Sequence, residues 1–188
     1  MSRTESLSAE GASPSADVPS VRVWDPVVRL FHWTVMTGCV LNLFILDEGK
    51  YWHRMTGYVV AGAIVVRLIW GFAGTPYARF TQFFPTPRKV RDHIEALLQG
   101  RDERTLGHSP LGSVMMITLM ALLAAVCLTG WMTTIDAFWG EKWLETLHGL
   151  IGNMIMVLAF VHAASALVES WRHGENLVWS MVPGRKRL

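Results

Sequence analysis

Two histidines stand fourteen residues apart in an almost uninterrupted apolar segment near the carboxyl end of the chain, His148 and His162. An ionisable ring inside an apolar span is costly and usually faces the interior of a helix bundle for a functional reason. At ~100° per residue, this spacing comes within about 40° of four full turns, so both rings leave nearly the same helix face. At about 1.5 Å per residue the rings are roughly 21 Å apart along the axis. The spacing therefore predicts two sites on one helix, one near each surface of a membrane.

Two further histidines match these levels in earlier apolar segments. His32 lies just inside the cytoplasmic end of the first segment, near the level of His162, and His53 lies at the outer start of the second, near the level of His148. The sequence thus supplies an inner pair (His32 and His162) and an outer pair (His53 and His148). The other three histidines fall in loops or at a membrane boundary, where we expect solvated side chains: His93, His108 and His173.

Two imidazoles at one level, with no other ligand, suit haem b, a planar macrocycle held between helices with one axial ligand on each side. Zinc or a di-metal site would need Cys, Asp or Glu at the same depth, and the spans offer only Glu169, at the very end. The two cysteines, Cys39 and Cys127, lie in apolar runs and are interpreted as small hydrophobic residues. The alternative is that all four histidines are interfacial polar residues that mark the ends of spans.

Three arginines stand where each could pair with a haem propionate. Arg29 lies one turn before His32, Arg54 follows His53, and Arg67 lies in the cytoplasmic half of the second apolar segment. The alternative for these arginines is snorkelling, in which the apolar stem stays in the membrane and the charged group reaches water.

Membrane-spanning helices must position these side chains. The chain is 51% hydrophobic and only 17% charged, a balance too apolar for an ordinary soluble domain of 188 residues. A spanning helix needs about 20 predominantly apolar residues. Four segments meet this requirement: residues 27–46, 55–74, 110–132 and 147–171. We therefore expect an all-α fold, an integral membrane four-helix bundle that encloses two b haems.

The distribution of Lys and Arg predicts the direction of the spans. Both ends of the chain and the long middle connection are rich in these residues, whereas the other two connections hold few. By the positive-inside rule, both termini and the middle connection are cytoplasmic. Residues 1–20 lack an apolar core and are expected to form a disordered tail. Residues 21–188 are then the transmembrane domain.

One more helix is predicted in the middle connection, in the stretch TPRKVRDHIEALLQG. Thr86 suits an N-cap, Pro87 the first helical position and Gly100 a stop. Val90, Ile94, Leu97 and Leu98 share one helical face, which predicts a short amphipathic helix. It lies either on the cytoplasmic membrane surface or against the protein itself.

Several stretches resemble the small bacterial di-haem cytochromes b561. They are VRVWDPVVRLFHW, WHRMTGYVVAGAIVVRLIWG, GHSPLG and the carboxyl end from LETLHGLIG to VPGRKRL, so the resemblance covers residues 21–188. The segment WDPVVRLFHW is also similar to the cytochrome b subunits of membrane hydrogenases, a related four-helix group. The resemblance implies two b haems, with His32 and His162 holding the cytoplasmic one and His53 and His148 the periplasmic one.

An iron held by two histidines has no open position for a substrate, so electron transfer is the expected role. The first hypothesis is a cytochrome that passes electrons between ubiquinone and a periplasmic partner such as a c-type cytochrome. The second, drawn from relatives, is an enzyme that oxidises superoxide and reduces ubiquinone, although the outer loops are acidic on balance and would repel this anion. The third is a histidine-lined metal or proton transporter. We do not expect the protein to bind nucleic acids.

Overall fold

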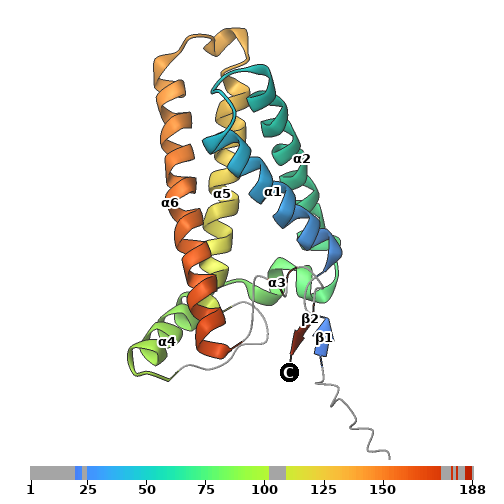
Figure 1. Cartoon of the computed structure of the whole chain (residues 1–188), viewed down its shortest axis with the longest axis vertical. Helices are drawn as coiled ribbons and strands as arrows, with labels where there is room; N and C mark the ends of the chain where they lie inside the picture. Colours follow the sequence, from blue (N-terminus) through green and yellow to red (C-terminus); the bar gives the residue numbers. More distant parts are fainter. Residues whose placement is uncertain are drawn as a thin grey trace, which may run out of the picture.

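A computed structural model gives the fold of the chain, described for residues 20–22, 25–101, 109–174, 179, 181 and 185–187. Each of its four longest helices is long and apolar enough to cross a membrane. They stand side by side as a bundle (Figure 1): α1 (Pro26–Phe44), α2 (Tyr51–Ala73), α5 (Pro110–Met132) and α6 (Lys142–His173). The predicted all-α architecture with four membrane spans is confirmed.

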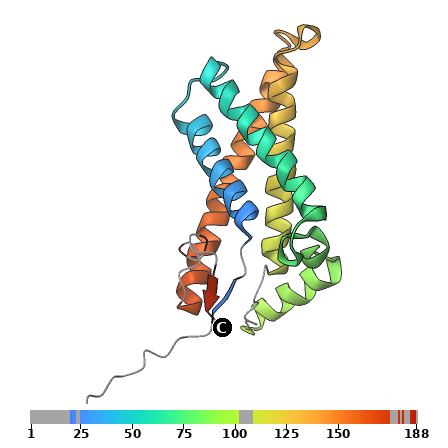
Figure 2. The ribbon, with the colours of Figure 1, turned by 90° about the vertical axis from the view of Figure 1, so that its right-hand side faces the viewer.

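The bundle consists of two helical hairpins. α1 packs against α2, α5 packs against α6, and α2 joins the hairpins by packing against α5. Figure 2 shows both short connections at one end of the bundle, here called the short-loop end. The opposite end, here called the terminal end, carries the long connection between α2 and α5. The described part of this connection, up to residue 101, holds three short helices: η1 (Pro76–Ala78), α3 (Phe80–Phe83) and α4 (Pro87–Leu98).

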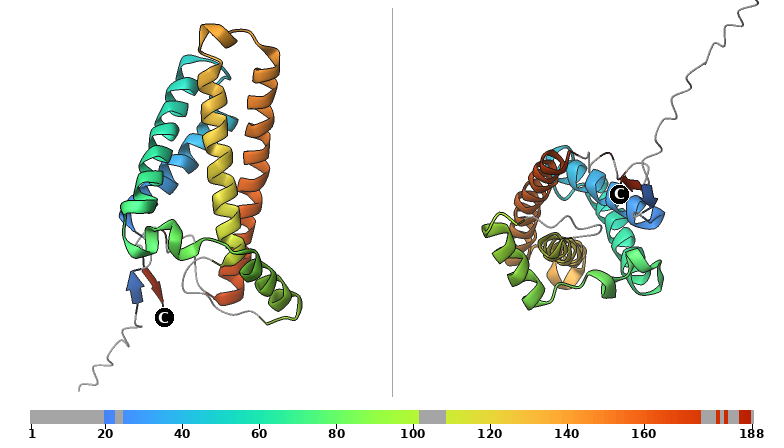
Figure 3. Two further views of the ribbon diagram at one scale, coloured as in Figure 1. Left: turned by 180° about the vertical axis from the view of Figure 1, so that it is seen from behind. Right: turned by 90° about the horizontal axis from the view of Figure 1, so that it is seen from below.

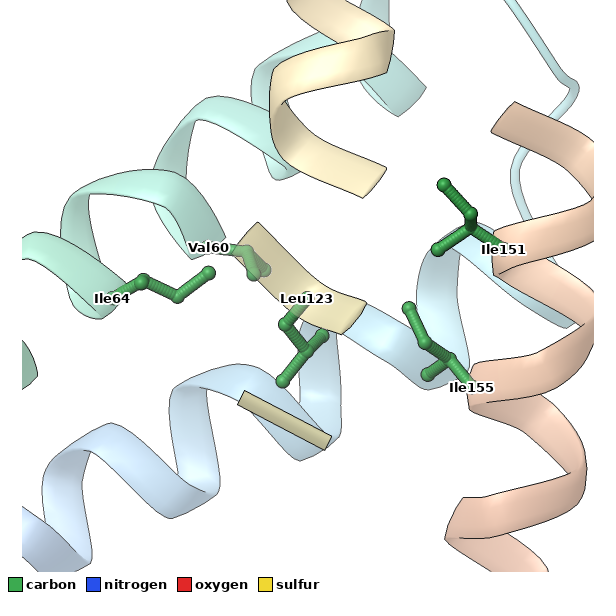
Figure 4. Packing of buried hydrophobic residues seen from close by; sticks show 5 residues of the cluster. All are labelled: Val60, Ile64, Leu123, Ile151 and Ile155. Carbon is green, nitrogen blue, oxygen red and sulfur yellow. The ribbon is translucent and has the colours of Figure 1, made fainter. Parts of the chain in front are cut away.

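A small apolar cluster fills the middle of the bundle (Figure 4). It joins side chains of α2, α5 and α6: Val60, Ile64, Leu123, Ile151 and Ile155. Along α6, the two isoleucines lie between His148 and His162. The cluster is therefore an apolar layer between the level of the outer pair and the level of the inner pair.

Two spans begin earlier than hydropathy predicts. α2 starts at Tyr51 rather than at residue 55, and α6 starts at Lys142 rather than at residue 147. Hydropathy detects the apolar window, whereas a helix continues through polar residues because its backbone hydrogen bonds are internal. Leu144, fully buried, anchors the added turn of α6. In consequence His53 lies in the first turn of α2 and His148 in the second turn of α6, where helical geometry fixes their directions.

The predicted amphipathic helix is α4, and its caps are confirmed. Thr86 is the N-cap and its hydroxyl accepts a hydrogen bond from the backbone N–H of Lys89 at 3.4 Å, while Pro87 is the first helical residue. Val90 and Ile94 line a shallow hollow with Val114 of α5. Leu98 on the same face is 83% exposed. Figure 3 shows α4 at the terminal end of the bundle. The helix thus contacts the protein over part of its apolar face and leaves the rest open.

Two short strands join the ends of the described chain, which the sequence analysis did not predict. β1 (Ser20–Arg22) pairs antiparallel with β2 (Arg185–Arg187), with Ser20 opposite Arg187. Segments so far apart in sequence leave no local pattern by which their pairing can be recognised. Of the predicted tail, Ser20 belongs to β1, and residues 1–19 lie outside the described residues.

Candidate cofactor sites

The outer pair brings together two rings from different helices. The ring centroids of His53 on α2 and His148 on α6 are 6.1 Å apart, with an interplanar angle of 67°. A metal–imidazole bond of about 2 Å plus a ring radius of about 1 Å on each side puts the centroids of two opposite ligands roughly 6 Å apart. The separation in this structure therefore fits two imidazoles that share one iron.

Two neighbouring residues of α5 position the His148 ring. The hydroxyl Oγ1 of Thr129 lies 3.1 Å from Nδ1 of His148. The ring also packs closely on the next residue, because a Cβ added to Gly130 would lie 2.9 Å from Cε1 of His148. One ring nitrogen is thus held by a protein hydrogen bond, and Nε2 is left for a metal, the usual arrangement of a ligating histidine.

Open space borders both rings of the outer pair. Gly57 follows His53 by four residues and Gly152 follows His148 by four, so each glycine lies on the same helix face as its histidine. A Cβ added to Gly57 would meet no atom within 4 Å, and one added to Gly152 would meet only Leu43, at 3.9 Å. Side chains at these positions would occupy the space beside the rings. The residues present therefore fit a macrocycle between α2 and α6.

A third helix supports His53. The side-chain amide nitrogen of Asn42 on α1 donates a hydrogen bond to the backbone carbonyl of His53 at 3.3 Å. Within the described part of the chain, Nδ1 of His53 and Oδ1 of Asn42 are buried without hydrogen-bond partners. Leaving such atoms unpaired costs about 1–3 kcal/mol each. Since either imidazole nitrogen can bind a metal, an unpaired ring nitrogen fits a ligand role.

The inner pair joins α1 to α6. His32 on α1 lies within electrostatic range of His162 on α6. Nδ1 of His32 is also buried without a hydrogen-bond partner among the described residues. The ring of His32 packs edge-on against Trp33, with centroids 6.0 Å apart. The structure thus brings the rings of the outer pair into contact, and it places His32 and His162 of the inner pair within electrostatic range of each other.

Arg67 is the most deeply placed of the three predicted arginines. Its residue surface is only 2% exposed, and its guanidinium carbon lies 4.6 Å from the centre of the Phe80 ring. Its Nη1 atom has no hydrogen-bond partner in the described residues. A cation–π contact of this kind is worth about 1–2 kcal/mol, and the charge of Asp25 also acts on the guanidinium. A carboxylate such as a haem propionate would complete this environment.

A buried carboxylate at the terminal end ties α1 to α2. Asp25 caps α1 by accepting a hydrogen bond from the backbone N–H of Val27 at 2.8 Å. It also accepts hydrogen bonds from the indole nitrogen of Trp70 at 3.1 Å and from the hydroxyl of Thr75 at 2.8 Å. Its charge interacts with that of Arg67. Asp25 therefore helps to fix the end of α2 from which Arg67 projects.

The other two predicted arginines lie at opposite ends. The Nε atom of Arg29 donates a hydrogen bond to the backbone carbonyl of Met181 at 2.9 Å, which connects the start of α1 to the carboxyl-terminal segment. Arg54 follows His53 at the short-loop end and has an exposed side chain. Of the three, Arg67 is the one enclosed by the bundle.

The remaining chemistry-bearing residues form no further site in the described residues, where no three His, Cys, Asp or Glu side chains gather as metal ligands. His93 is half-buried on α4, His173 ends α6, and His108 lies outside the described residues. Cys39 and Cys127 are free thiols packed against the apolar cluster. The Cys127 thiol donates a weak hydrogen bond to the carbonyl of Gly57 at 3.8 Å.

Sequence reasoning missed the residues that orient the histidines. Asp25 had a local signal, because an Asp before a Pro at the start of an apolar segment is typical of a helix N-terminus. Thr129 and Gly130 also had one, since they lie in the third span at the depth of His148. Asn42 had none, because its contact with His53 depends on how α1 packs against α2.

Comparisons with known proteins identify the family of the chain. The profile of the family described as prokaryotic cytochrome b561 matches residues 23–184. A probable Ni/Fe-hydrogenase B-type cytochrome subunit of Bradyrhizobium diazoefficiens is 22% identical, over 90% of this chain and 87% of its own length. The protein of the same name from Cupriavidus necator is 24% identical, over 93% of this chain and 91% of its own length. No solved structure gives a significant match.

The family profile spans all four membrane helices and all four histidines of the two pairs. Membership of this family implies haem b and electron transfer in a membrane. The chain belongs to the prokaryotic cytochrome b561 family.

Proposed function

We propose that the protein is a di-haem cytochrome that carries electrons across the bacterial inner membrane. The outer pair and the inner pair each hold one haem b. The observation that carries this proposal is the 6.1 Å separation between the rings of His53 and His148, which come from different helices. When bound, each haem would supply one-electron redox chemistry, and the two histidines of each pair would hold its iron.

α6 is the common support of the two sites. It supplies His148 to the outer pair and His162 to the inner pair, roughly 21 Å apart along the helix. α2 completes the outer site and α1 completes the inner one. The apolar cluster that includes Leu123 lies between these levels. This arrangement supports electron passage between the two faces of the membrane.

We propose that one redox partner is a quinone of the membrane pool, namely ubiquinone. Oxidation of a quinol to a quinone releases two electrons and two protons. Sites that accept one electron at a time suit this reaction because the two electrons can leave in sequence. Both termini are proposed to be cytoplasmic, on the strength of the Lys and Arg distribution. The short-loop end, with the outer pair, then faces the periplasm.

The charge of the short-loop end favours a basic protein partner. The ammonium of Lys50 forms an ion pair with Asp47 at 2.7 Å, which neutralises one of the few cations there. Four further carboxylates remain exposed at this end: Glu48, Asp136, Glu141 and Glu145. Such a surface steers a basic c-type cytochrome towards it and repels superoxide. Electron exchange with a periplasmic cytochrome is therefore preferred to superoxide oxidation.

A second candidate comes from the relatives. Those from Bradyrhizobium diazoefficiens and Cupriavidus necator are named Ni/Fe-hydrogenase B-type cytochrome subunits and align over most of their length with this chain. The chain is then the membrane subunit of a larger redox enzyme, which hands its electrons to the outer pair. Co-purification from the native membrane separates the candidates, because a hydrogenase subunit retains stoichiometric partner subunits whereas a c-type cytochrome docks transiently.

A reduced-minus-oxidised spectrum of the purified full-length protein, with haem quantification, tests the proposal. We expect b-type bands and two haems per chain. A preparation that folds but binds no haem would contradict it and would favour the histidine-lined transporter. Stopped-flow mixing with superoxide is expected to give no fast haem reduction; fast reduction would restore the superoxide-oxidising alternative.

A further inference from the structure

Thr129 is a buried polar residue that touches a proposed axial ligand without being one. It lies in the last turns of α5 and is 7% exposed. Its Oγ1 atom is within hydrogen-bond distance of three groups: the carbonyl of Ala125 at 2.9 Å, the carbonyl of Val126 at 3.1 Å, and Nδ1 of His148 at 3.1 Å. The roles of these groups can be assigned by counting protons.

A threonine hydroxyl has one proton and two lone pairs, and a backbone carbonyl can only accept. The Thr129 proton is therefore directed to the α5 backbone, to Ala125 or Val126. Towards His148 the oxygen then offers a lone pair, so Nδ1 of His148 is the donor and carries the ring proton. In a neutral imidazole with a proton on Nδ1, the lone pair available for a metal is on Nε2.

Gly130 makes this hydrogen bond possible. A Cβ at this position would lie 2.9 Å from Cε1 and 3.3 Å from Nδ1 of His148. These distances are shorter than normal carbon contacts, so a larger residue would push the ring away from α5. Thr129 and Gly130 together thus form a seat for the ring, whose polar contacts are the Thr129 hydroxyl and the backbone of Val126.

The seat distinguishes His148 from two of the other ligands. In the described residues, Nδ1 of His53 and Nδ1 of His32 are buried with no hydrogen-bond partner. A substitution at Thr129 should therefore affect His148 alone among these histidines. Its effect on the outer site can then be distinguished from any effect on the inner site.

We propose that Thr129 is a positioning residue of the outer haem site, which fixes His148 with its proton on Nδ1 and its Nε2 free to bind iron. This inference rests on the proposed function. A hydrogen bond accepted from the distal ring nitrogen raises the basicity of a histidine ligand and fixes its orientation. A more basic ligand stabilises the ferric iron over the ferrous iron. Loss of the bond should therefore make the outer haem easier to reduce.

The test compares three variants of the full-length, haem-loaded protein. Thr129→Val keeps the size of the side chain and removes the oxygen. Thr129→Ser keeps the hydroxyl and serves as the conservative rescue. Thr133→Val removes a second hydroxyl, at the C-cap of the same helix, which donates a hydrogen bond to the backbone carbonyl of Gly130 at 2.7 Å. Each variant is measured by haem-to-protein ratio, redox titration and the low-spin ferric signals in electron paramagnetic resonance.

For Thr129→Val we expect the equilibrium constant for reduction of one haem to rise about tenfold, which is ~59 mV for one electron. The other haem, Thr129→Ser and Thr133→Val should keep wild-type values. Loss of one haem in Thr129→Val alone would also support the proposal. Unchanged potentials and signals at full haem content would overturn it, as would equal shifts of both haems or the same change in Thr133→Val. A wild-type protein without two haems would instead refute the proposed function.

Discussion

His53 and His148 face each other across the bundle with ring centroids 6.1 Å apart, although one belongs to α2 and the other to α6. These helices belong to different hairpins and are joined through α5. Ring positions of this kind depend on the packing of the whole bundle. They also give each histidine of the proposed sites one partner histidine. The loss of one histidine should therefore affect one site and spare the other.

Single replacements of the histidines should therefore divide them into two pairs. We expect His148→Ala and His53→Ala to lose the same haem, and His162→Ala and His32→Ala to lose the other, because one axial ligand alone does not hold the group. The measurement is the haem-to-protein ratio with low-temperature difference spectra, which distinguish the two haems. His93→Ala on α4 is the control and should keep both. Full haem content in any of the four variants would contradict the pairing.

A side chain at Gly57 should displace the outer haem. The position is one turn from His53, and a Cβ there meets no atom within 4 Å, so Gly57→Leu fills the space beside the ring. The fold should persist because leucine favours a helix more than glycine does, by about 1 kcal/mol. We expect the haem content to fall from two to one per chain.

The matched control for this variant is Gly62→Leu. Gly62 lies in the same helix, is exposed and also has open space around it, so two haems should remain. If Gly57→Leu retained both haems, the space beside His53 would not be the haem site.

Arg67 should raise the reduction potential of the inner haem. Its guanidinium is buried at the terminal end, has an unpaired Nη1 atom and lies against Phe80. A nearby positive charge favours the reduced iron, which carries one positive charge fewer. Arg67→Gln should therefore lower the equilibrium constant for reduction of the inner haem about tenfold, or ~59 mV. Redox titration checks this, with the haem identified by comparison with His162→Ala.

Arg91→Gln provides the control for charge alone. Arg91 is exposed on α4, where it forms an ion pair with Glu95 at 2.7 Å. Its replacement should leave both potentials unchanged. A shift of the outer haem, or of neither, in Arg67→Gln would show that Arg67 does not act on the inner site.

Asp25 should contribute to stability rather than to electron transfer. Asp25→Ala removes the cap of α1 and leaves the donors of Trp70 and Thr75 without an acceptor. The loss is about 2–4 kcal/mol, from about 1 kcal/mol for the cap and about 1–3 kcal/mol for the two part-buried hydrogen bonds. Thermal unfolding in detergent, followed by circular dichroism, should show a lower midpoint.

Two comparisons define this effect. Asp25→Asn keeps an acceptor oxygen and should lose less stability than Asp25→Ala. Asp92→Ala removes an exposed carboxylate of α4 and should leave the midpoint nearly unchanged. Equal midpoints for Asp25→Ala and the wild type would mean that the hydrogen bonds of Asp25 add nothing to stability.

The sequence alone determined the four spans and the depth of each histidine. Hydropathy and helical rise are local properties, so they predict which residues cross the membrane and which rings lie at one level. The same reasoning predicted α4 with its caps at Thr86 and Pro87, because a helix cap is a short-range hydrogen bond. It placed the starts of α2 and α6 too late, because charged residues interrupt the apolar pattern in their first turns: Arg54 in α2, and Lys142 and Glu145 in α6.

Tertiary structure alone decided which groups meet. The contact of Thr129 with His148, the support of His53 by Asn42 and the pairing of β1 with β2 all join segments that are separate in sequence. Such contacts depend on the rotation and spacing of packed helices, which a single chain's periodicity does not specify. A sequence gives the height of a residue in the membrane, whereas the side chain it faces is fixed only when the four helices pack.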